Sequence, residues 1–124
     1  MLRDSFYSII SQTQQVESSL ITQVKINAAH DIFNGHFPGN PVVPGVCMLQ
    51  MIKDILSGKI NDGIRLQSLA NVKFIAVVDP TQHDTLEINI KFENSGENAY
   101  KVNAVITAQD IVFLKISNAV YIKL

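Results

Sequence analysis

The segment from Pro44 to Gly58 constrains the fold of this chain most, because it predicts a helix that is apolar around most of its circumference. Pro44 is favourable as the first helical residue, and the helix is expected to end near Gly58. Its apolar residues are Val46, Cys47, Met48, Leu49, Met51, Ile52, Ile55 and Leu56. Its polar residues, which fall on one narrow stripe, are Gln50, Lys53, Asp54 and Ser57. A helix over residues 44–58 with so little polar surface must be covered by other elements on most sides.

Segments with strand-like alternation lie on both sides of this helix and can supply the cover. Residues 19–27 place Leu20, Val24 and Ile26 on one side and polar residues on the other, as a half-buried strand does. Further strands are predicted at residues 64–76, 86–93, 100–108 and 111–121. Because short turns separate them, we expect residues 64–124 to form an antiparallel meander.

The first residues show a helical rather than an alternating pattern. Leu2, Phe6 and Ile9 fall on one helical face, together with Ile10, and Asp4 and Ser5 precede them as possible caps. We therefore expect a short amphipathic helix within residues 1–16.

The order strand, loop, helix and further strands favours an α+β fold in which a curved antiparallel sheet covers one helix. A chain of 124 residues is close to the usual size of one domain, so residues 1–124 are expected to share one core.

Residues 28–44 lack any periodic pattern and contain three of the four prolines. Residues that precede proline are biased to extended conformations, which applies to Phe37 and Asn40, and Gly39 lets the chain bend between them. This composition predicts an ordered loop that holds His36 stiffly. At the end of the loop, Gly45 leaves a helix N-terminal N–H uncovered, so that an oxygen gaining negative charge can approach it.

The run from His36 to Gly45, His-Phe-Pro-Gly-Asn-Pro-Val-Val-Pro-Gly, resembles the signature of the β-hydroxyacyl-acyl-carrier-protein dehydratases, His-Phe-Pro-Gly-x-Pro-x-x-Pro-Gly, at all seven fixed positions. The segments 34–35, 72–74 and 78–80 are also similar to the family, and the resemblance covers roughly residues 19–122. It implies the hot-dog fold, a curved antiparallel sheet wrapped around one long central helix.

The resemblance also implies a mechanism on 3-hydroxyacyl thioesters, with residues 28–44 as the active-site loop. His36 would take the C2 proton, for which an unperturbed pKa of about 6.5 is well suited. The Gly45 amide would hold the thioester oxygen as it becomes enolate-like. Three further positions are assigned to oxyanion or substrate binding, and these are Phe37, Pro44 and Val46.

The chain departs from the family pattern at Gln50. In the family, a Glu or Asp of the helix assists departure of the 3-hydroxyl as water, and this residue is contributed by the other subunit of a dimer. The matching position lies five residues after Gly45, where this chain has Gln50. A carboxamide can orient a hydroxyl but cannot deliver a proton at neutral pH. Acid–base assistance is typically worth about 10²–10⁴-fold, so a homodimer with Gln50 should be slow unless another acid replaces it. Asp54, one helical turn further on, is the only nearby acid in sequence.

Several functions therefore remain open. The chain can be a dehydratase-like homodimer, one subunit of a heterodimer with another hot-dog chain that retains the acid, or a non-catalytic subunit that binds acyl thioesters. A thioesterase is a fourth alternative. The acyl group can be carried by acyl carrier protein or by coenzyme A, and Gln50 can also be part of a solvated helix stripe.

The remaining residues favour ordinary structural roles. Cys47, the single cysteine, lies among apolar helix residues and is expected in the core, and His30 and His83 are expected in loops. A net charge of −1 argues against nucleic acid as a partner, and no apolar run is long enough for a membrane span. The scattered lysines favour an acidic carrier protein only weakly. We expect no metal or cofactor and a cytoplasmic location.

Overall fold

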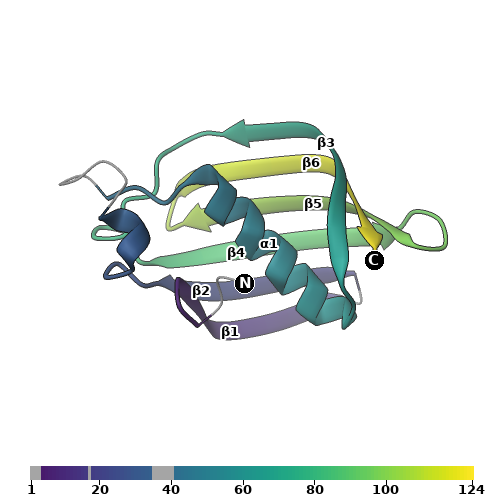
Figure 1. The fold of residues 1–124 in the computed structure, drawn as a ribbon, viewed down its shortest axis with the longest axis horizontal. Coiled ribbons are helices and arrows are strands. Elements are labelled where there is room, and N and C mark those ends of the chain that lie inside the picture. Colours follow the sequence, from purple (N-terminus) through teal and green to yellow (C-terminus); the bar gives the residue numbers. More distant parts are fainter. Residues whose placement is uncertain (1–3, 17, 35–40) are drawn as a thin grey trace.

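A computed structural model describes residues 4–16, 18–34 and 41–124 of the protein. These residues form one antiparallel sheet and one long helix, α1 (Gly45–Ile60), which packs on one face of the sheet (Figure 1). The strands are β1 (Tyr7–Val16), β2 (Ser19–Ile26), β3 (Ile64–Phe74), β4 (Thr85–Asn94), β5 (Ala99–Ala108) and β6 (Ile111–Lys123). Their order in the sheet is β1-β2-β4-β5-β6-β3. The expected α+β hot-dog architecture, a curved sheet around one central helix, is confirmed.

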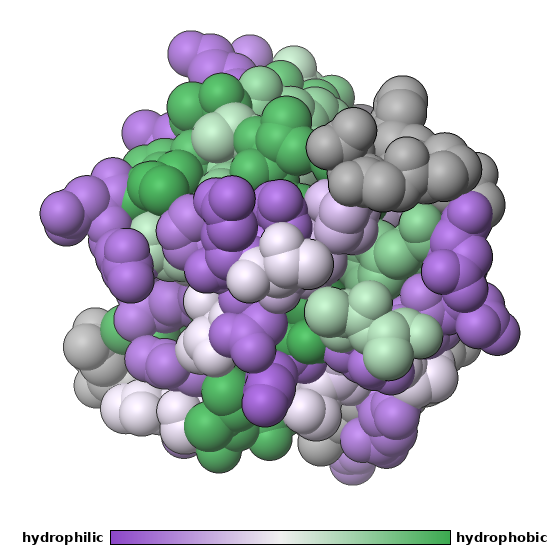
Figure 2. All heavy atoms as spheres, turned by 90° about the vertical axis from the view of Figure 1, so that its left-hand side faces the viewer, coloured by the Kyte–Doolittle hydropathy of each residue, from purple (hydrophilic) through white to green (hydrophobic). Residues whose placement is uncertain are grey.

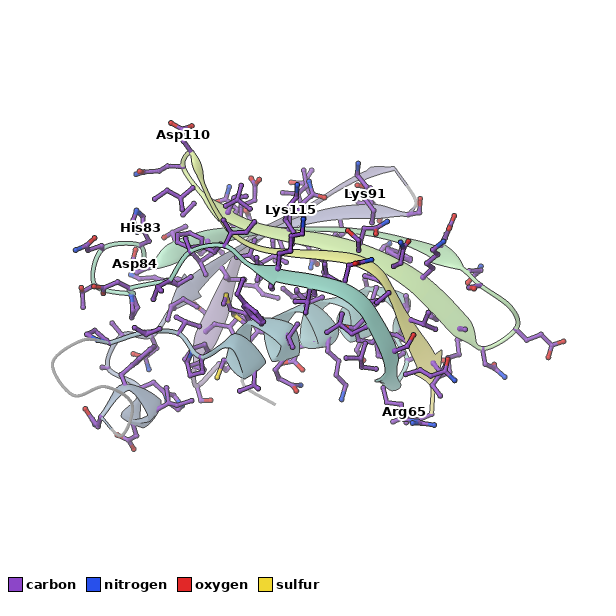
Figure 3. All side chains as sticks on the ribbon, turned by 90° about the horizontal axis from the view of Figure 1, so that it is seen from above. Arg65, His83, Asp84, Lys91, Asp110 and Lys115 are labelled. Carbon is purple, nitrogen blue, oxygen red and sulfur yellow. The ribbon has the colours of Figure 1, made fainter. Side chains whose placement is uncertain are left out.

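The core lies between α1 and the inner face of the sheet. Met51, Ile52 and Leu56 of the helix are completely buried, and so are Ile88 of β4 and Ile106 of β5. Seen along the sheet, α1 lies on one side, and the labelled Lys91 and Lys115 project from the other (Figure 3). Each strand therefore separates an apolar face from a polar one, as the alternation in the sequence predicts.

The helix starts and ends slightly later than predicted. Pro44 is not its first residue but its N-cap, with extended backbone angles (φ −62°, ψ 145°). At the other end the helix runs past Gly58 to Ile60, and Asn61 ends it in the left-handed conformation (φ 56°) while its N–H donates to the carbonyl of Ser57. Asn61 can end the helix in place of a glycine because asparagine tolerates this conformation better than most residues.

The helix expected within residues 1–16 is wrong, because Tyr7–Val16 is a strand. This strand, β1, pairs with β2 from Tyr7↔Ile26 to Val16↔Ser19, with two register shifts. β2 is bonded to β4 on its other side, and β1 covers the edge that would otherwise be open. Ile9, Ile10 and Thr13 favour a strand through their branched side chains, and pairing with β2 outweighs the helical spacing of the apolar residues.

The predicted meander of residues 64–124 is correct for β4, β5 and β6, which are consecutive neighbours, but not for β3. β3 pairs with β6, from Ile64↔Lys123 to Phe74↔Leu114. It cannot pair with β4, the next strand in the chain, because β2 and β5 occupy both edges of β4. β3 consequently forms one border of the sheet, opposite β1 (Figure 1).

Among the described residues of the loop before α1, Asp31–Phe33 form a short helix, η1. His30 is its N-cap, and its Nδ1 accepts a hydrogen bond from the Ile32 amide at 3.0 Å. The His30 ring also meets the ring of Phe6 edge-on, with 5.5 Å between their centroids. His30 thus has a structural role in the loop, as its position in the sequence suggests.

We predict that replacing Ile52 by alanine lowers the free energy of unfolding by about 2–5 kcal/mol, because a fully buried side chain of the central helix is lost and a cavity remains. Chemical denaturation measures this change. The neighbouring Lys53 on the same helix provides the control, since Lys53→Ala should change stability by less than about 0.5 kcal/mol. Equal effects of the two substitutions would contradict the wrapped-helix arrangement.

Candidate active site at the start of the central helix

The start of α1 is fixed by the chain segment that follows β3. The Val43 amide donates to the Val78 carbonyl at 2.9 Å, and both side chains are buried. The Pro44 carbonyl then accepts hydrogen bonds from the amides of Cys47 at 3.0 Å and Met48 at 3.2 Å. The direction and position of the helix are therefore set before its first residue.

The amides of Gly45 and Val46 are the first two of the helix. No carbonyl precedes them in the helix to accept their hydrogen bonds, and Pro44 has no side-chain acceptor to cap them. Within the described residues, neither amide donates to another backbone group. They lie at the positive end of the helix dipole, where an oxygen with developing negative charge is stabilised.

A close neighbour leaves little room for a side chain at position 45. A Cβ atom on Gly45 would lie 2.8 Å from Cε1 and 3.0 Å from Cζ of the Phe74 ring, which comes from the end of β3. Any other residue would displace this ring. The ring itself is half exposed, at 52%. The start of α1, which has no side chain at Gly45, and the end of β3 therefore pack directly against each other.

Exposed apolar side chains gather around this contact. Val46 is 73% exposed and Val77 is 64% exposed. Phe74 and Ile75, which precede Val77 in the chain, are each 52% exposed, and the Phe74 ring lies against Gly45, the neighbour of Val46. Figure 2 views this end of the molecule and shows hydrophobic side chains in its upper part, on the side where β3 lies in Figure 1. We call Val46, Phe74, Ile75 and Val77 the β3-end patch.

Further along α1, Gln50 and Asp54 form a hydrogen-bonded pair. Nε2 of Gln50 donates to Oδ1 of Asp54 at 2.8 Å, and the Tyr7 hydroxyl of β1 donates to Oδ2 of Asp54 at 3.3 Å. Asp54 is only 7% exposed and Tyr7 2%, whereas Gln50 is half-buried. The predicted polar stripe is therefore not a uniformly solvated face, because its central carboxylate is buried and bonded from two sides.

His36 and Phe37 lie outside the described residues. The described segments that flank the loop, η1 and the start of α1, lie at the same end of the molecule (Figure 1). Of the predicted site residues, Gly45 and Val46 are brought together at the helix start with Pro44. Gln50 lies on the same helix further along, and its partner is Asp54.

Tyr7 is a contributor that the sequence did not indicate. The spacing of its apolar neighbours predicts a helix, and a helix at this place in the chain implies no contact with residue 54. The β-branched residues among positions 9–16 were the available signal for a strand. Only the antiparallel pairing with β2 brings Tyr7 to the inner face beside the helix.

Two other candidates take structural roles. Burial raises the pKa of the Cys47 thiol above its usual value, which makes it a poor nucleophile, in agreement with the predicted core position. His83 meets the Phe113 ring edge-on at 5.8 Å in the β3–β4 connection, where Figure 3 labels it beside Asp84.

The described residues contain neither a candidate metal site nor a candidate membrane-spanning helix. No group of three or more His, Cys, Asp or Glu side chains there is arranged to hold a metal ion. None of the helices in this part of the chain has the length and apolar character needed to cross a bilayer.

Comparison with solved structures supports the fold. The dehydratase heterocomplex ApeI:P from Xenorhabdus doucetiae contains a chain that superposes with a TM-score of 0.71 and 20% identity, over 90% of this chain and 95% of that one. A hypothetical thioesterase protein with coenzyme A from Streptococcus pneumoniae superposes with a TM-score of 0.63 and 12% identity, over 94% and 84%. At these identities the likeness is one of fold.

Curated relatives are 3-hydroxyacyl-[acyl-carrier-protein] dehydratases named FabZ. Those of Rickettsia massiliae and Rickettsia akari are 29% and 31% identical to this chain over an aligned length of 85 residues, and the alignment covers 62% of this chain. The match spans 57% of the length of each relative. A family described as ApeI-like, ApeI dehydratase, matches residues 12–112. Because this match covers most of the chain, the protein belongs to the ApeI-like dehydratase family.

Proposed function

We propose that the protein acts on 3-hydroxyacyl thioesters of acyl carrier protein and removes water to give the enoyl thioester. The observation that carries this proposal is the bare helix start at Gly45 and Val46, which directly follows the dehydratase-like loop of His36. Membership of the ApeI-like family and the likeness to FabZ support the same reaction. A role in acyl-chain biosynthesis and a cytoplasmic location are part of the proposal.

In this reaction, the amide of Gly45 would donate to the thioester oxygen. Removal of the C2 proton by His36 places negative charge on that oxygen, and the amides at the helix start stabilise it. Pro44 contributes by fixing the helix start, and Val46 and Phe37 would border the substrate. No metal is needed for these steps, since a base and hydrogen-bond donors suffice.

The second half of the reaction, departure of the hydroxyl, requires a proton. Gln50 can bind the hydroxyl but cannot protonate it. This favours a second form of the proposal, in which the protein is one subunit of a heterodimer and its partner supplies the acid. The ApeI:P structure, which has the same fold, is described as a dehydratase heterocomplex and is a precedent for such an assembly.

The edge of β3 is the surface that we assign to the partner subunit, whether this is a second copy or another hot-dog chain. Within the described residues, β3 is bonded to β6 on one side only. Most of its residues are exposed, including Leu66, and the β3-end patch continues from its last residue. A long open edge with apolar neighbours is the kind of surface that proteins cover by pairing.

A non-catalytic subunit that binds acyl thioesters remains the alternative, and Gln50 is the feature that favours it. The thioesterase alternative has weaker support, because it depends on a likeness of fold at 12% identity. The first two of the following experiments test the dehydratase, heterodimer and non-catalytic forms of the proposal, and the third tests the assigned interface.

We predict that the protein, alone or with its partner subunit, hydrates a short enoyl thioester and that His36→Ala lowers this rate by about 10²–10⁴-fold, because the base is lost. Absorbance of the enoyl thioester follows the reaction, with acyl-carrier-protein and coenzyme A substrates compared. His83→Ala is the matched control, since His83 lies in another loop against Phe113, and it should retain the rate. An unchanged rate in His36→Ala would exclude the proposed base.

We predict that the heterodimer and the non-catalytic subunit differ in their response to a partner. If the partner supplies the acid, mixing this chain with a hot-dog subunit that has Glu or Asp at the matching position produces turnover. That turnover should disappear when this chain carries His36→Ala. Turnover of the mixture that is insensitive to His36→Ala would mean that this chain is a non-catalytic subunit.

We predict that Leu66→Lys/Ile75→Lys weakens dimerisation, because charges on the β3 border oppose burial of this surface. Sedimentation velocity should show a shift from dimer towards monomer at micromolar concentration. Ile10→Lys is the control on the opposite border of the sheet, since Ile10 is 53% exposed and Ile75 is 52% exposed. A dimer that survives the double substitution but not Ile10→Lys would place the interface on β1 instead.

A further inference from the structure

We propose that Asp54 is a positioning residue that fixes the orientation of the Gln50 carboxamide, so that Gln50 presents its carbonyl oxygen to the 3-hydroxyl of the substrate. This inference rests on the proposed function and names the residue that sets how Gln50 takes part in it. It starts from a carboxylate that the mechanism above does not use, although it is buried one helical turn from Gln50.

The contact with Asp54 determines which end of the carboxamide faces it. An ionised carboxylate only accepts hydrogen bonds, and in a carboxamide only the NH₂ group can donate. The 2.8 Å contact between Nε2 of Gln50 and Oδ1 of Asp54 therefore excludes the flipped carboxamide, which would place two oxygens together. With Nε2 held in this way, Oε1 of Gln50 is directed away from Asp54.

Asp54 is itself held in place from a second element. The Tyr7 hydroxyl of β1 donates to Oδ2 at 3.3 Å, so the carboxylate is bonded on both oxygens by groups from β1 and α1. Both Tyr7 and Asp54 are almost fully buried. The Gln50–Asp54 contact, at 2.8 Å, has the length of a strong hydrogen bond, and the longer contact with Tyr7 at 3.3 Å adds a second attachment of Asp54 from β1.

The consequence for the reaction is that the hydroxyl would be bound and not protonated. A substrate hydroxyl that meets Oε1 of Gln50 donates its hydrogen to it, and the oxygen that must leave as water receives no proton from Gln50. Gln50 thus orients the substrate hydroxyl and does not supply the proton.

The test is a double-mutant cycle on kcat in the form of the protein that turns over. Asp54→Asn keeps the size of the side chain but lets it accept or donate, so Gln50 loses its single orientation. We expect kcat to fall about tenfold with little change in KM. In a Gln50→Met background, Asp54→Asn should have no further effect on kcat, because the group that it positions is absent.

A merely structural Asp54 would give a different cycle. Asp54→Asn would then lower kcat by the same factor in the wild type and in the Gln50→Met background, and that result would overturn the proposal. Ser57→Ala is the control on the same stripe of the helix, since Ser57 bonds to the carbonyl of Asp62 and not to Gln50. It should leave kcat unchanged in both backgrounds.

A reversed pair tests the same idea by rescue. In Gln50→Glu alone, two carboxylates would lie within hydrogen-bond distance and repel each other. In Gln50→Glu/Asp54→Asn, the carboxylate introduced at position 50 can accept from the amide introduced at position 54, and the net charge equals that of the wild type. We expect kcat of the double variant to exceed that of Gln50→Glu, which carries the same introduced carboxyl group. A double variant no better than Gln50→Glu would count against a positioning pair.

One measurement separates failure of this inference from failure of the proposed function. The side-chain NH₂ hydrogen of Gln50 that is bonded to Asp54 should exchange slowly with solvent, as measured by NMR. Asp54→Asn should abolish this protection from exchange. Protection that persists in Asp54→Asn overturns the inference, whatever the activity. Absence of any turnover dependent on His36, with the protection intact, instead rejects the dehydratase and leaves the Asp54 support of Gln50 in place.

Discussion

The burial of an almost completely apolar helix is the interaction on which the rest of this structure depends. Met51, Ile52 and Leu56 are removed from water only because the sheet curves around α1, and at about 25 cal/mol per Å² of apolar surface this is the main source of stability. The sheet must therefore be wide enough to cover the helix. That requirement explains why both β1 and β3 extend the borders beyond the central strands.

The same packing fixes the candidate active site. The helix is anchored before its first residue by the hydrogen bond from the Val43 amide to the Val78 carbonyl, and the Phe74 ring packs 2.8 Å from where a Cβ atom on Gly45 would lie. The helix start, whose amides have no intrahelical partner, is therefore held at one end of the sheet beside β3. A site built in this way couples the chemistry to the border strand that we assign to the partner subunit.

The pair of Gln50 and Asp54 connects the substitution at position 50 with its surroundings. A carboxamide that replaces an acid loses the ability to donate a proton, yet it gains a fixed orientation when a buried carboxylate accepts its N–H. In the proposed reaction this arrangement would let Gln50 bind the substrate hydroxyl without protonating it. Tyr7 completes it from β1, at the border opposite β3.

The sequence by itself determined the helix, its apolar character, the alternating strands that follow it and the family resemblance of the loop, because these depend on local periodicity and on fixed spacing. It did not determine the strand at Tyr7–Val16 or the place of β3 beside β6. Both are decided by which sheet edges are left open after the central strands pair, and this is a property of the whole sheet. For the same reason only the tertiary structure could bring Tyr7 to Asp54 and Phe74 to Gly45, contacts between residues 47 and 29 positions apart in the chain.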